Sequence, residues 1–358
     1  MEIGIMCNFA HQHIGGSEIV IKHISEILVG DYGHELNVYS FSCDSHFREQ
    51  GVNYYPCLKG DRFVSQIGRN DHLMVYSDSF WEFDTLVRNI DKIDCRVSVV
   101  LVGAYYMQSH PEIFRLLKQN IDRFNLITHS STTIDYKWCI DNGLPVRVIP
   151  NGVALEEFGN NSINFREKYN IKDKYMFLNV SSFFFGKGQD MLADIGGKIK
   201  GDYVIVQISS SADYPYEKRF LKRCRDRCKN INIRFLRDIP REDVVAAFKN
   251  SDIFVFTSKK EVSPLVILES QAAGLPWVSM DVGDIRERKG GKVINNNNED
   301  GNGYKIINNK IISSYMVKIA DILELKDLNN QLVLAGQEDI KNLDWKKIVP
   351  LYDRIFNL

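Results

Sequence analysis

The stretch SDIFVFTSKKEVSPLVILESQAAGLPWVSMD, residues 251–281, decides the fold class of this chain. Its apolar run Ile253–Phe256 predicts a short buried strand of a parallel sheet. The pattern from Pro264 to Ala273 is compatible with a helix, and Gly274-Leu275-Pro276 ends it. A strand followed by a helix predicts an α/β protein. The loop between them is then expected at the carboxyl edge of the sheet, where open α/β sheets bind ligands.

Two glutamates lie in this stretch with a spacing of eight residues. Glu261 falls in the predicted loop, and Glu269 is expected about two turns into the helix. An isolated pair of this kind would be interpreted as two solvated side chains on an amphipathic helix. Here the N–H groups of Ser263, Leu265 and Val266 are predicted to open the helix, and such a terminus favours an anion. The pair therefore indicates a binding site.

The run EVSPLVILESQAAGLP, residues 261–276, resembles a known signature. The signature is E-G-F-G-L-x-x-x-E-A-M-A-x-G-x-P of the retaining glycosyltransferases of family GT4, also described as glycosyl transferases group 1, which have the GT-B fold. The resemblance implies that Glu261 contacts the hydroxyls of a donor sugar. It implies that Ser263-Pro264-Leu265, with Val266, presents main-chain groups to a diphosphate. Glu269 would accept hydrogen bonds from the ribose hydroxyls, for which a two-oxygen acceptor is suited.

The composition is that of a soluble globular protein. The chain has 358 residues, of which 44% are hydrophobic and 25% charged, and this length predicts two domains. A net charge of −1 gives no case for nucleic acid as a partner. No apolar stretch is long enough for a membrane span, and the first residues predict a strand, not a signal peptide.

Seven cysteines without paired short spacing predict reduced thiols and a cytoplasmic protein. Cys224 and Cys228 are one helical turn apart in the charged segment KRFLKRCRDRCKN. They lack partners for a metal site, and we expect them on a solvated helix face.

Apolar strand-like runs alternate with helical segments along the whole chain, which predicts two doubly wound, Rossmann-like parallel sheets. The predicted strands are 3–9, 36–41, 73–76, 97–102, 126–128, 146–149, 175–180, 203–208, 231–236, 253–256 and 277–280. The turn Pro150-Asn151-Gly152 predicts the boundary between domains 1–152 and 153–340. The string IPNGV that contains this turn resembles the interdomain segment of the family.

The family resemblance extends to the domain arrangement. It implies an acceptor-side domain 1–152 and a donor-binding domain 153–340, which face each other across a cleft. It also implies that a terminal helix at about 341–358 crosses back onto the first domain.

The loop after the first predicted strand reads HQHIGGSEI, residues 11–19. The spacing G-x-G-x-x-G is absent, so the loop does not match a dinucleotide-binding fingerprint. Adjacent glycines permit a close approach of the backbone to a ligand, and the helix that follows favours anions at its start. The loop resembles the GGAE loop of the family, which implies that Gly16 and Ser17 lie near the donor phosphate or the acceptor.

The segment NVSSFFFGKGQDML, residues 179–192, resembles the family's V-G-R-L-x-x-x-K-G-x-D-x-L. The resemblance implies that Lys187 offsets the charge that develops on the leaving diphosphate. The family's arginine falls at Ser182, which hydrogen-bonds a phosphate but cannot neutralise it. Arg237 precedes a turn that often lies by the nucleotide base in this family; a contact to base or phosphate and a plain surface charge both stay open. Gly283, in a V-G-G-x-x-E-like turn, would let the backbone pass close to the donor.

The catalytic histidine of the family has no clear counterpart. In the family it often follows a strand near the middle of the first domain, and here His110 comes seven residues after that strand and its Gly103. His110 is either the positional equivalent in a longer loop or a surface residue ahead of Pro111. The sequence leaves both open.

The resemblance implies a hexosyltransferase-type enzyme of class EC 2.4 that moves a sugar from a UDP- or GDP-type donor to an acceptor hydroxyl with retention. It implies no metal and no cofactor, since the nucleotide sugar is a substrate, and a front-face displacement. We expect a saccharide or a lipid-linked saccharide as acceptor in glycan or polysaccharide synthesis. The expected location is the cytoplasm, with peripheral contact at the inner membrane face.

Two alternatives remain at this point. One is another GT-B enzyme, either a sugar phosphorylase or an epimerase. The other is a non-catalytic nucleotide-sugar-binding module, which Ser182 in place of arginine and the ambiguous His110 favour.

Overall fold

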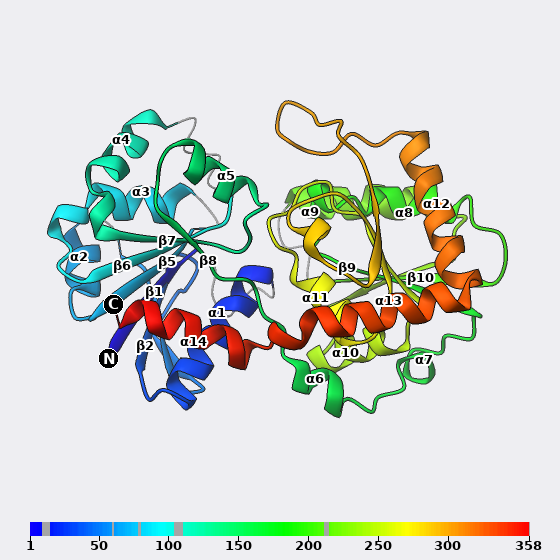
Figure 1. The fold of residues 1–358 in the computed structure, drawn as a ribbon. Coiled ribbons are helices and arrows are strands. Elements are labelled where there is room, and N and C mark those ends of the chain that lie inside the picture. The colour runs from blue at the N-terminus through cyan, green and yellow to red at the C-terminus, as the bar shows by residue number, and fades with distance from the viewer. Residues whose placement is uncertain (9–14, 59–60, 78–79, 104–109, 211–214, 358) are drawn as a thin grey trace. The chain divides into compact units, whose positions relative to one another are not determined.

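The computed structural model describes residues 1–8, 15–58, 61–77, 80–103, 110–210 and 215–357. The chain divides into two compact units, and Figure 1 shows that each is built around a sheet with helices on its faces. Unit 1 comprises Met1–Gly152 and Trp345–Leu358, and unit 2 comprises Val153–Asp344. The division after Gly152 coincides with the turn at which the sequence predicts the boundary. Among the described residues, no helix is both long enough and apolar enough to cross a membrane.

Unit 1 contains an eight-stranded sheet in the order β3-β4-β2-β1-β5-β6-β7-β8. All neighbours are parallel except the short β3, which pairs antiparallel with β4. The strands are β1 (Glu2–Cys7), β2 (Glu35–Ser40), β3 (Phe47–Glu49), β4 (Val52–Pro56), β5 (His72–Ser77), β6 (Arg96–Leu101), β7 (Phe124–Thr128) and β8 (Val146–Val148).

Helices cover both faces of this sheet. The helices of unit 1 are α1 (Gly16–Gly30), α2 (Asp61–Ile67), α3 (Phe80–Arg88), α4 (Pro111–Gln119), α5 (Ile134–Asp141) and α14 (Trp345–Phe356). The main core packs the sheet against α2, α3, α4 and α5 through residues such as Phe63, Phe83 and Ile113. On the other face α14 packs beside α1, where the ring of His23 stacks on Trp345 at 5.6 Å.

The terminal helix is firmly held within unit 1. His34 and Asp353 are joined by a 2.7 Å contact between Nε2 and Oδ1. Gly152 is needed for close packing, because a Cβ at this position would lie 2.5 Å from the indole of Trp345. The predicted terminal helix is thus present, although it begins at Trp345 and not near residue 341.

Unit 2 contains a fully parallel six-stranded sheet in the order β11-β10-β9-β12-β13-β14. The strands are β9 (Tyr175–Val180), β10 (Tyr203–Ser209), β11 (Ile233–Arg237), β12 (Ile253–Phe256), β13 (Trp277–Met280) and β14 (Gly291–Ile294). The helices are α6 (Leu155–Asn160), α7 (Phe165–Lys168), α8 (Asp190–Gly196), α9 (Pro215–Arg227), α10 (Arg241–Asn250), α11 (Leu265–Ala272), α12 (Asn309–Glu324) and α13 (Lys326–Asp339). Helices α9, α8 and α12 form one layer, in which α8 contacts both of the others, and α6, α7, α10, α11 and α13 form the other (Figure 1).

The predicted α/β class with two parallel sheets is confirmed. Three strands of the described residues were missed, namely β3, β4 and β14. The prediction for Cys224 and Cys228 is wrong, since both side chains are buried, at 0% and 4% exposure. Cys224 lies on the inner stripe of α9 with Phe220, and Cys228 follows one turn later, just past the end of the helix. The spacing along the chain, and not the surrounding charge, determines where they lie.

Candidate active site

The candidate site of unit 2 begins where the strand order of its sheet reverses. Strands β9 and β12 are neighbours in space, but the chain proceeds outward from β9 to β10 and β11 and then returns to β12. Ligands of open α/β sheets bind at the carboxyl ends of the strands beside such a reversal. The loop after β9 carries Lys187, and the loop after β12 carries Glu261.

These two predicted residues are in direct contact. Nζ of Lys187 donates to Oε1 of Glu261 at 2.7 Å, and the side chains are 28% and 12% exposed. A second hydrogen bond also joins the two loops, because the side-chain hydroxyl of Thr257 donates to the backbone carbonyl of Lys187 at 2.9 Å. Gly188 has a φ of 66°, and a Cβ there would lie 2.2 Å from the carbonyl oxygen of Thr257. Only glycine fits this junction.

Helix α11 begins at Leu265, with Pro264 as the N-cap residue. The N–H groups of Leu265 and Val266 therefore have no acceptor within the helix. Glu269 is the fifth helical residue, one turn into the helix and not two as predicted.

The side chain of Glu269 is held by a residue that the sequence analysis did not single out. Nη2 of Arg241, at the start of α10, lies 2.6 Å from Oε1 of Glu269 and 2.7 Å from Oε2 of Glu157 on α6. Burial lowers the pKa of Arg241, but the two carboxylates outweigh this effect and raise it above its usual value. Glu269 itself is only 4% exposed. Its position is thus fixed by a shared guanidinium.

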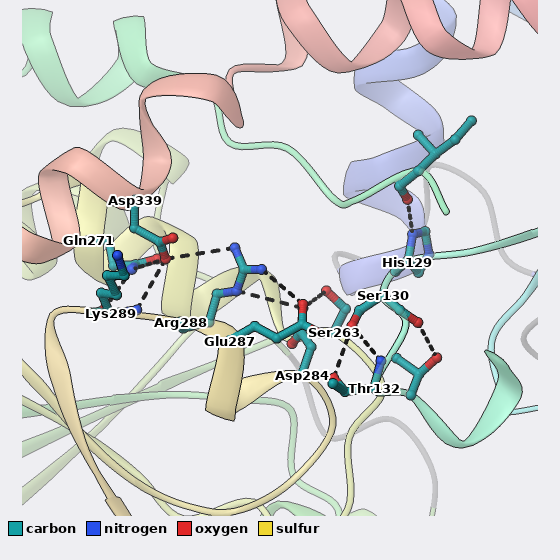
Figure 2. Close-up of polar contacts among 12 residues, drawn as sticks. His129, Ser130, Thr132, Ser263, Gln271, Asp284, Glu287, Arg288, Lys289 and Asp339 are labelled. Atoms are coloured by element: carbon teal, nitrogen blue, oxygen red, sulfur yellow. Dashed lines mark hydrogen bonds and ion pairs between the residues drawn. The ribbon is translucent and has the colours of Figure 1, made fainter. Parts of the chain in front are cut away.

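A second network holds the loop after β12, which carries Glu261 and Ser263 (Figure 2). The hydroxyl of Ser263 donates to Oδ2 of Asp284 at 2.8 Å, and Nε of Arg288 lies 3.9 Å from the same oxygen. Arg288 also approaches Asp339 of α13, which accepts a hydrogen bond from the amide of Gln271 on α11. The network therefore connects the loop, α11 and α13.

Asp284 is an unusual member of this network. Burial raises the pKa of its carboxyl to about 6, although Arg288 and the Ser263 hydroxyl act in the opposite direction. Its Oδ1 is buried and finds no partner among the described residues. Ser263, predicted to face the diphosphate, has its hydroxyl bound to this carboxylate.

The structure gives a further reason for glycine at position 283. Its φ is 58°, and a Cβ would lie 2.4 Å from the carbonyl oxygen of Val262. The close neighbour that requires glycine at this position is thus the backbone of the loop after β12, which carries Glu261. The N–H of Asp284 donates to the same carbonyl at 3.0 Å.

A second cation lies beside the loop that carries Lys187. Lys259 is buried, with Nζ 3.3 Å from Oδ1 of Asp190 and 4.0 Å from the ring centroid of Phe185. Ser182, at the family's arginine position, is exposed, and its carbonyl accepts a hydrogen bond from Gln189. The loop thus contacts two ammonium groups, from Lys187 and Lys259.

Arg237 ends β11 with an exposed side chain. Strand β11 is separated from β9 by β10. Arg237 therefore does not join the Lys187–Glu261 pair. Within the described residues, no group of three or more His, Cys, Asp or Glu side chains could hold a metal ion.

The predicted residues of unit 1 lie at two of its helix starts. Helix α1 begins at Gly16 and Ser17, and Gly15 is its N-cap residue. A Cβ at Gly16 would meet nothing within 4 Å, whereas one at Gly15 would lie 2.5 Å from the carboxylate of Glu18. His110 is the N-cap residue of α4.

His129 is a further candidate that the sequence analysis missed. It follows β7, is 2% exposed, and lies 3.2 Å from both the hydroxyl of Tyr76 and the carbonyl oxygen of Ile149. Figure 2 shows its contact with that carbonyl. Burial lowers the pKa of His129 to about 4, so the imidazole is neutral at neutral pH. The only available signal was its place at the end of a predicted strand.

The family assignment follows from a comparison with family models. The model described as "Glycosyl transferases group 1" matches residues 161–339, which include Lys187, Arg241, Glu261 and Glu269. The chain belongs to the glycosyl transferases group 1. It is therefore a glycosyltransferase with the GT-B fold.

Two curated relatives show the breadth of this similarity. The GPI3 subunit of phosphatidylinositol N-acetylglucosaminyltransferase from Saccharomyces cerevisiae is 22% identical over 321 residues, which are 80% of this chain and 69% of the relative. The UDP-Gal:alpha-D-GlcNAc-diphosphoundecaprenol alpha-1,3-galactosyltransferase from Escherichia coli is 27% identical over 237 residues, which are 60% and 56% of the two chains.

Solved glycosyltransferases share the fold over the whole length. Sucrose-phosphate synthase from Thermosynechococcus elongatus superimposes with a TM-score of 0.79 at 14% identity, covering 99% of this chain and 98% of that one. HepE from Anabaena, in complex with UDP-glucose, also gives 0.79 at 14% identity and covers 100% of both chains. At such identities the likeness concerns the fold alone.

Proposed function

We propose that this protein transfers a sugar, with retention, from a nucleotide diphosphate sugar bound to unit 2 to an acceptor hydroxyl. The observation that carries the proposal is the contact between Lys187 and Glu261 at the strand reversal, beside the start of α11. A cation, an acceptor of hydroxyl hydrogen bonds and free helix N–H groups are the chemistry that a sugar diphosphate requires.

Each group has a distinct role in this proposal. The ammonium of Lys187 and the N–H groups of Leu265 and Val266 bind the diphosphate and stabilise the charge that develops as the sugar leaves. Glu261 accepts hydrogen bonds from the sugar hydroxyls, and Glu269, oriented by Arg241, binds the ribose.

The proposed chemistry needs neither a metal nor a cofactor. Charge on the leaving phosphate is balanced by Lys187, with Lys259 beside the same loop. Glu261 is engaged by a cation, which favours a binding role over that of a nucleophile. We therefore propose a front-face displacement in which the leaving phosphate oxygen takes the proton of the acceptor hydroxyl.

The relatives guide the choice of substrates. HepE was solved with UDP-glucose, and the two curated relatives are named for a UDP-galactose donor with a diphosphoundecaprenol-linked acceptor and for transfer to phosphatidylinositol. We propose a UDP-sugar as donor and a lipid-linked saccharide as acceptor, in glycan assembly at the cytoplasmic face of a membrane.

Thermal unfolding with UDP-, GDP-, ADP- and TDP-sugars tests the donor site. A donor at 100 times its dissociation constant adds about 2.7 kcal/mol to the free energy of unfolding. We expect this gain with UDP-sugars and its loss in Glu269→Ala. Glu324→Ala, which removes an exposed carboxylate on α12, is the control and keeps the gain.

The outcomes separate the remaining candidates. No gain with any nucleotide sugar would overturn the donor site. Sugar phosphate release from an oligosaccharide with inorganic phosphate would identify a phosphorylase. The anomeric configuration of the product, from NMR, tests retention, and unchanged turnover in EDTA tests metal independence.

A further inference from the structure

Helix α9 concentrates positive charge on unit 2. Residues 215–229, which comprise the helix and the two residues after it, contain seven Lys or Arg and two acidic residues, although the whole chain has a net charge of −1. Figure 1 shows α9 beside α8 on one face of the sheet.

The orientation of α9 is fixed by its apolar stripe. Phe220, Leu221 and Cys224 are buried and pack with Phe183 of the loop after β9. Burial raises the pKa of Cys224 to about 12, so this side chain stays a neutral thiol inside the unit. The opposite face of the helix is therefore permanently turned outward.

The seven cations of residues 215–229 fall into three groups. Arg227 lies 2.6 Å from Asp194 of α8, and Lys229 lies 3.0 Å from Asp226, so both are paired. Arg225 is exposed, and its guanidinium carbon lies 5.9 Å from the ring centroid of Phe235. The remaining four are exposed, and none of them forms an ion pair with a residue that the structure describes. These four, which we call the basic face, are Lys218, Arg219, Lys222 and Arg223.

The basic face is compact. At about 100° per residue its four positions occupy an arc of about 140°, centred opposite the buried stripe. Part of it lines a shallow depression that also includes Asp226 and Arg227. Two aromatic side chains lie at its border: Tyr216 is 48% exposed, and Phe185 is 46% exposed with its ring 6.5 Å from Phe220.

We propose that the basic face of α9 docks the protein on an anionic membrane surface. Unpaired cations in a cluster gain free energy at a negatively charged bilayer, and each contributes about a fivefold increase in binding. Tyr216 and Phe185 add exposed aromatic area of the kind that enters the interface region. A nucleic acid is a less suitable partner, because its binding requires a more extended basic surface than one helix provides. The net charge of the whole chain, −1, also argues against it.

The inference assigns residues to the membrane contact of the proposed function but does not depend on sugar transfer. Vesicle binding requires only the surface of unit 2. Glu269→Ala, which removes the proposed donor contact, is therefore expected to bind vesicles like the unmodified chain. The vesicle experiment and the donor-binding experiment therefore test the two proposals independently.

Sedimentation of the full chain with vesicles is the test. We expect binding to phosphatidylcholine vesicles that contain phosphatidylglycerol, no binding to phosphatidylcholine alone, and release by high salt. A variant combining Lys218→Gln, Arg219→Gln, Lys222→Gln and Arg223→Gln should lower the partition coefficient at least about tenfold. The matched control combines Lys172→Gln, Lys310→Gln, Lys318→Gln and Lys326→Gln, which removes the same charge elsewhere on unit 2 and should change binding less than about twofold.

The proposal fails if the two variants bind vesicles equally, or if the unmodified chain does not bind them. Stronger binding to a DNA or RNA duplex than to anionic vesicles would also overturn it. If the fourfold variant does not fold, the pair Lys222→Gln and Arg223→Gln replaces it, with an expected loss of several-fold. Circular dichroism checks the fold of each variant.

Discussion

The contact between Lys187 and Glu261 is a partly exposed ion pair, and its contribution to folding is small. A pair with these exposures stabilises by less than about 1 kcal/mol. We expect Lys187→Met and Glu261→Gln to shift the free energy of unfolding by no more than this. In contrast, Lys187→Met should lower kcat by about 100- to 1000-fold, since it removes charge stabilisation in the transition state.

A double-mutant cycle in denaturant and steady-state kinetics measure both effects. Loss of several kcal/mol of stability with an unchanged kcat would show that the pair is structural and that the diphosphate lies elsewhere.

Asp284 gives unit 2 a specific pH dependence. Burial raises the pKa of its carboxyl from 3.8 to about 6, so the folded unit binds more protons than the unfolded chain between these values. Its contribution to stability is therefore complete below pH 4 and is lost as the pH rises through 6. Asp284→Asn removes this loss.

The stability of Asp284→Asn relative to the unmodified chain should thus increase from pH 4 to pH 7, by up to about 3 kcal/mol. Urea unfolding across this range is the measurement. Asp327→Asn, which replaces an exposed carboxylate on α13, controls for net charge. If the free energies of unfolding of Asp284→Asn and of the unmodified chain changed in parallel with pH, the raised pKa of Asp284 would be contradicted.

At the scale of elements, Gly188 joins the loops after β9 and β12. Gly188→Ala places a Cβ against the carbonyl of Thr257 at a φ of 66°. Gly143 has the same φ of 66°, but its Cβ would meet nothing within 4 Å. We expect Gly143→Ala to cost about 1–2 kcal/mol, from backbone strain alone. Gly188→Ala should cost more and should also weaken the donor-dependent gain in stability.

Urea unfolding of the two variants separates strain from steric clash. Equal destabilisation would mean that the loops after β9 and β12 adapt without cost.

The periodicity of the sequence predicted elements well where strands are buried on both faces. Strands β9, β12 and β13 have the predicted bounds, because continuous apolar runs mark them. The short β3 is polar and forms only through pairing with β4, so no local pattern revealed it.

The candidate site was predictable only where residues belong to a local pattern. Glu261, Glu269 and Lys187 lie in motifs, whereas Arg241 reaches Glu269 from a helix 28 positions earlier in the sequence. Such long-range pairing depends on how α10 and α11 pack. The neutral state of His129 likewise comes from burial, which the sequence around it does not reveal.

At the scale of the whole molecule, the two units are expected to respond differently to acid. Unit 1 contains His72 and His129, and burial lowers the pKa of each from 6.5 to about 4. Their contribution to stability is complete above pH 6.5 and is lost as the pH falls towards 4, by up to about 3 kcal/mol for each group. The contribution of Asp284 in unit 2 has the opposite pH dependence, because it is lost as the pH rises.

Calorimetry at pH 7 and pH 5 should therefore show that the unfolding temperature of unit 1 falls more in acid than that of unit 2. His129→Asn should reduce this fall. An unchanged difference between the two transitions would show that His129 does not titrate as its burial implies.

Helix α14 has a consequence for synthesis of the chain. It completes unit 1, where the ring of Phe356 lies 4.7 Å from that of His72, yet it follows all of unit 2 in the sequence. On the ribosome, unit 2 is finished once residue 344 has emerged, while one face of the unit 1 sheet is still covered only in part, by α1 without α14. The half that is made first is thus the last to be completed. During that interval, its partly covered face is the part of the nascent chain most in need of a chaperone.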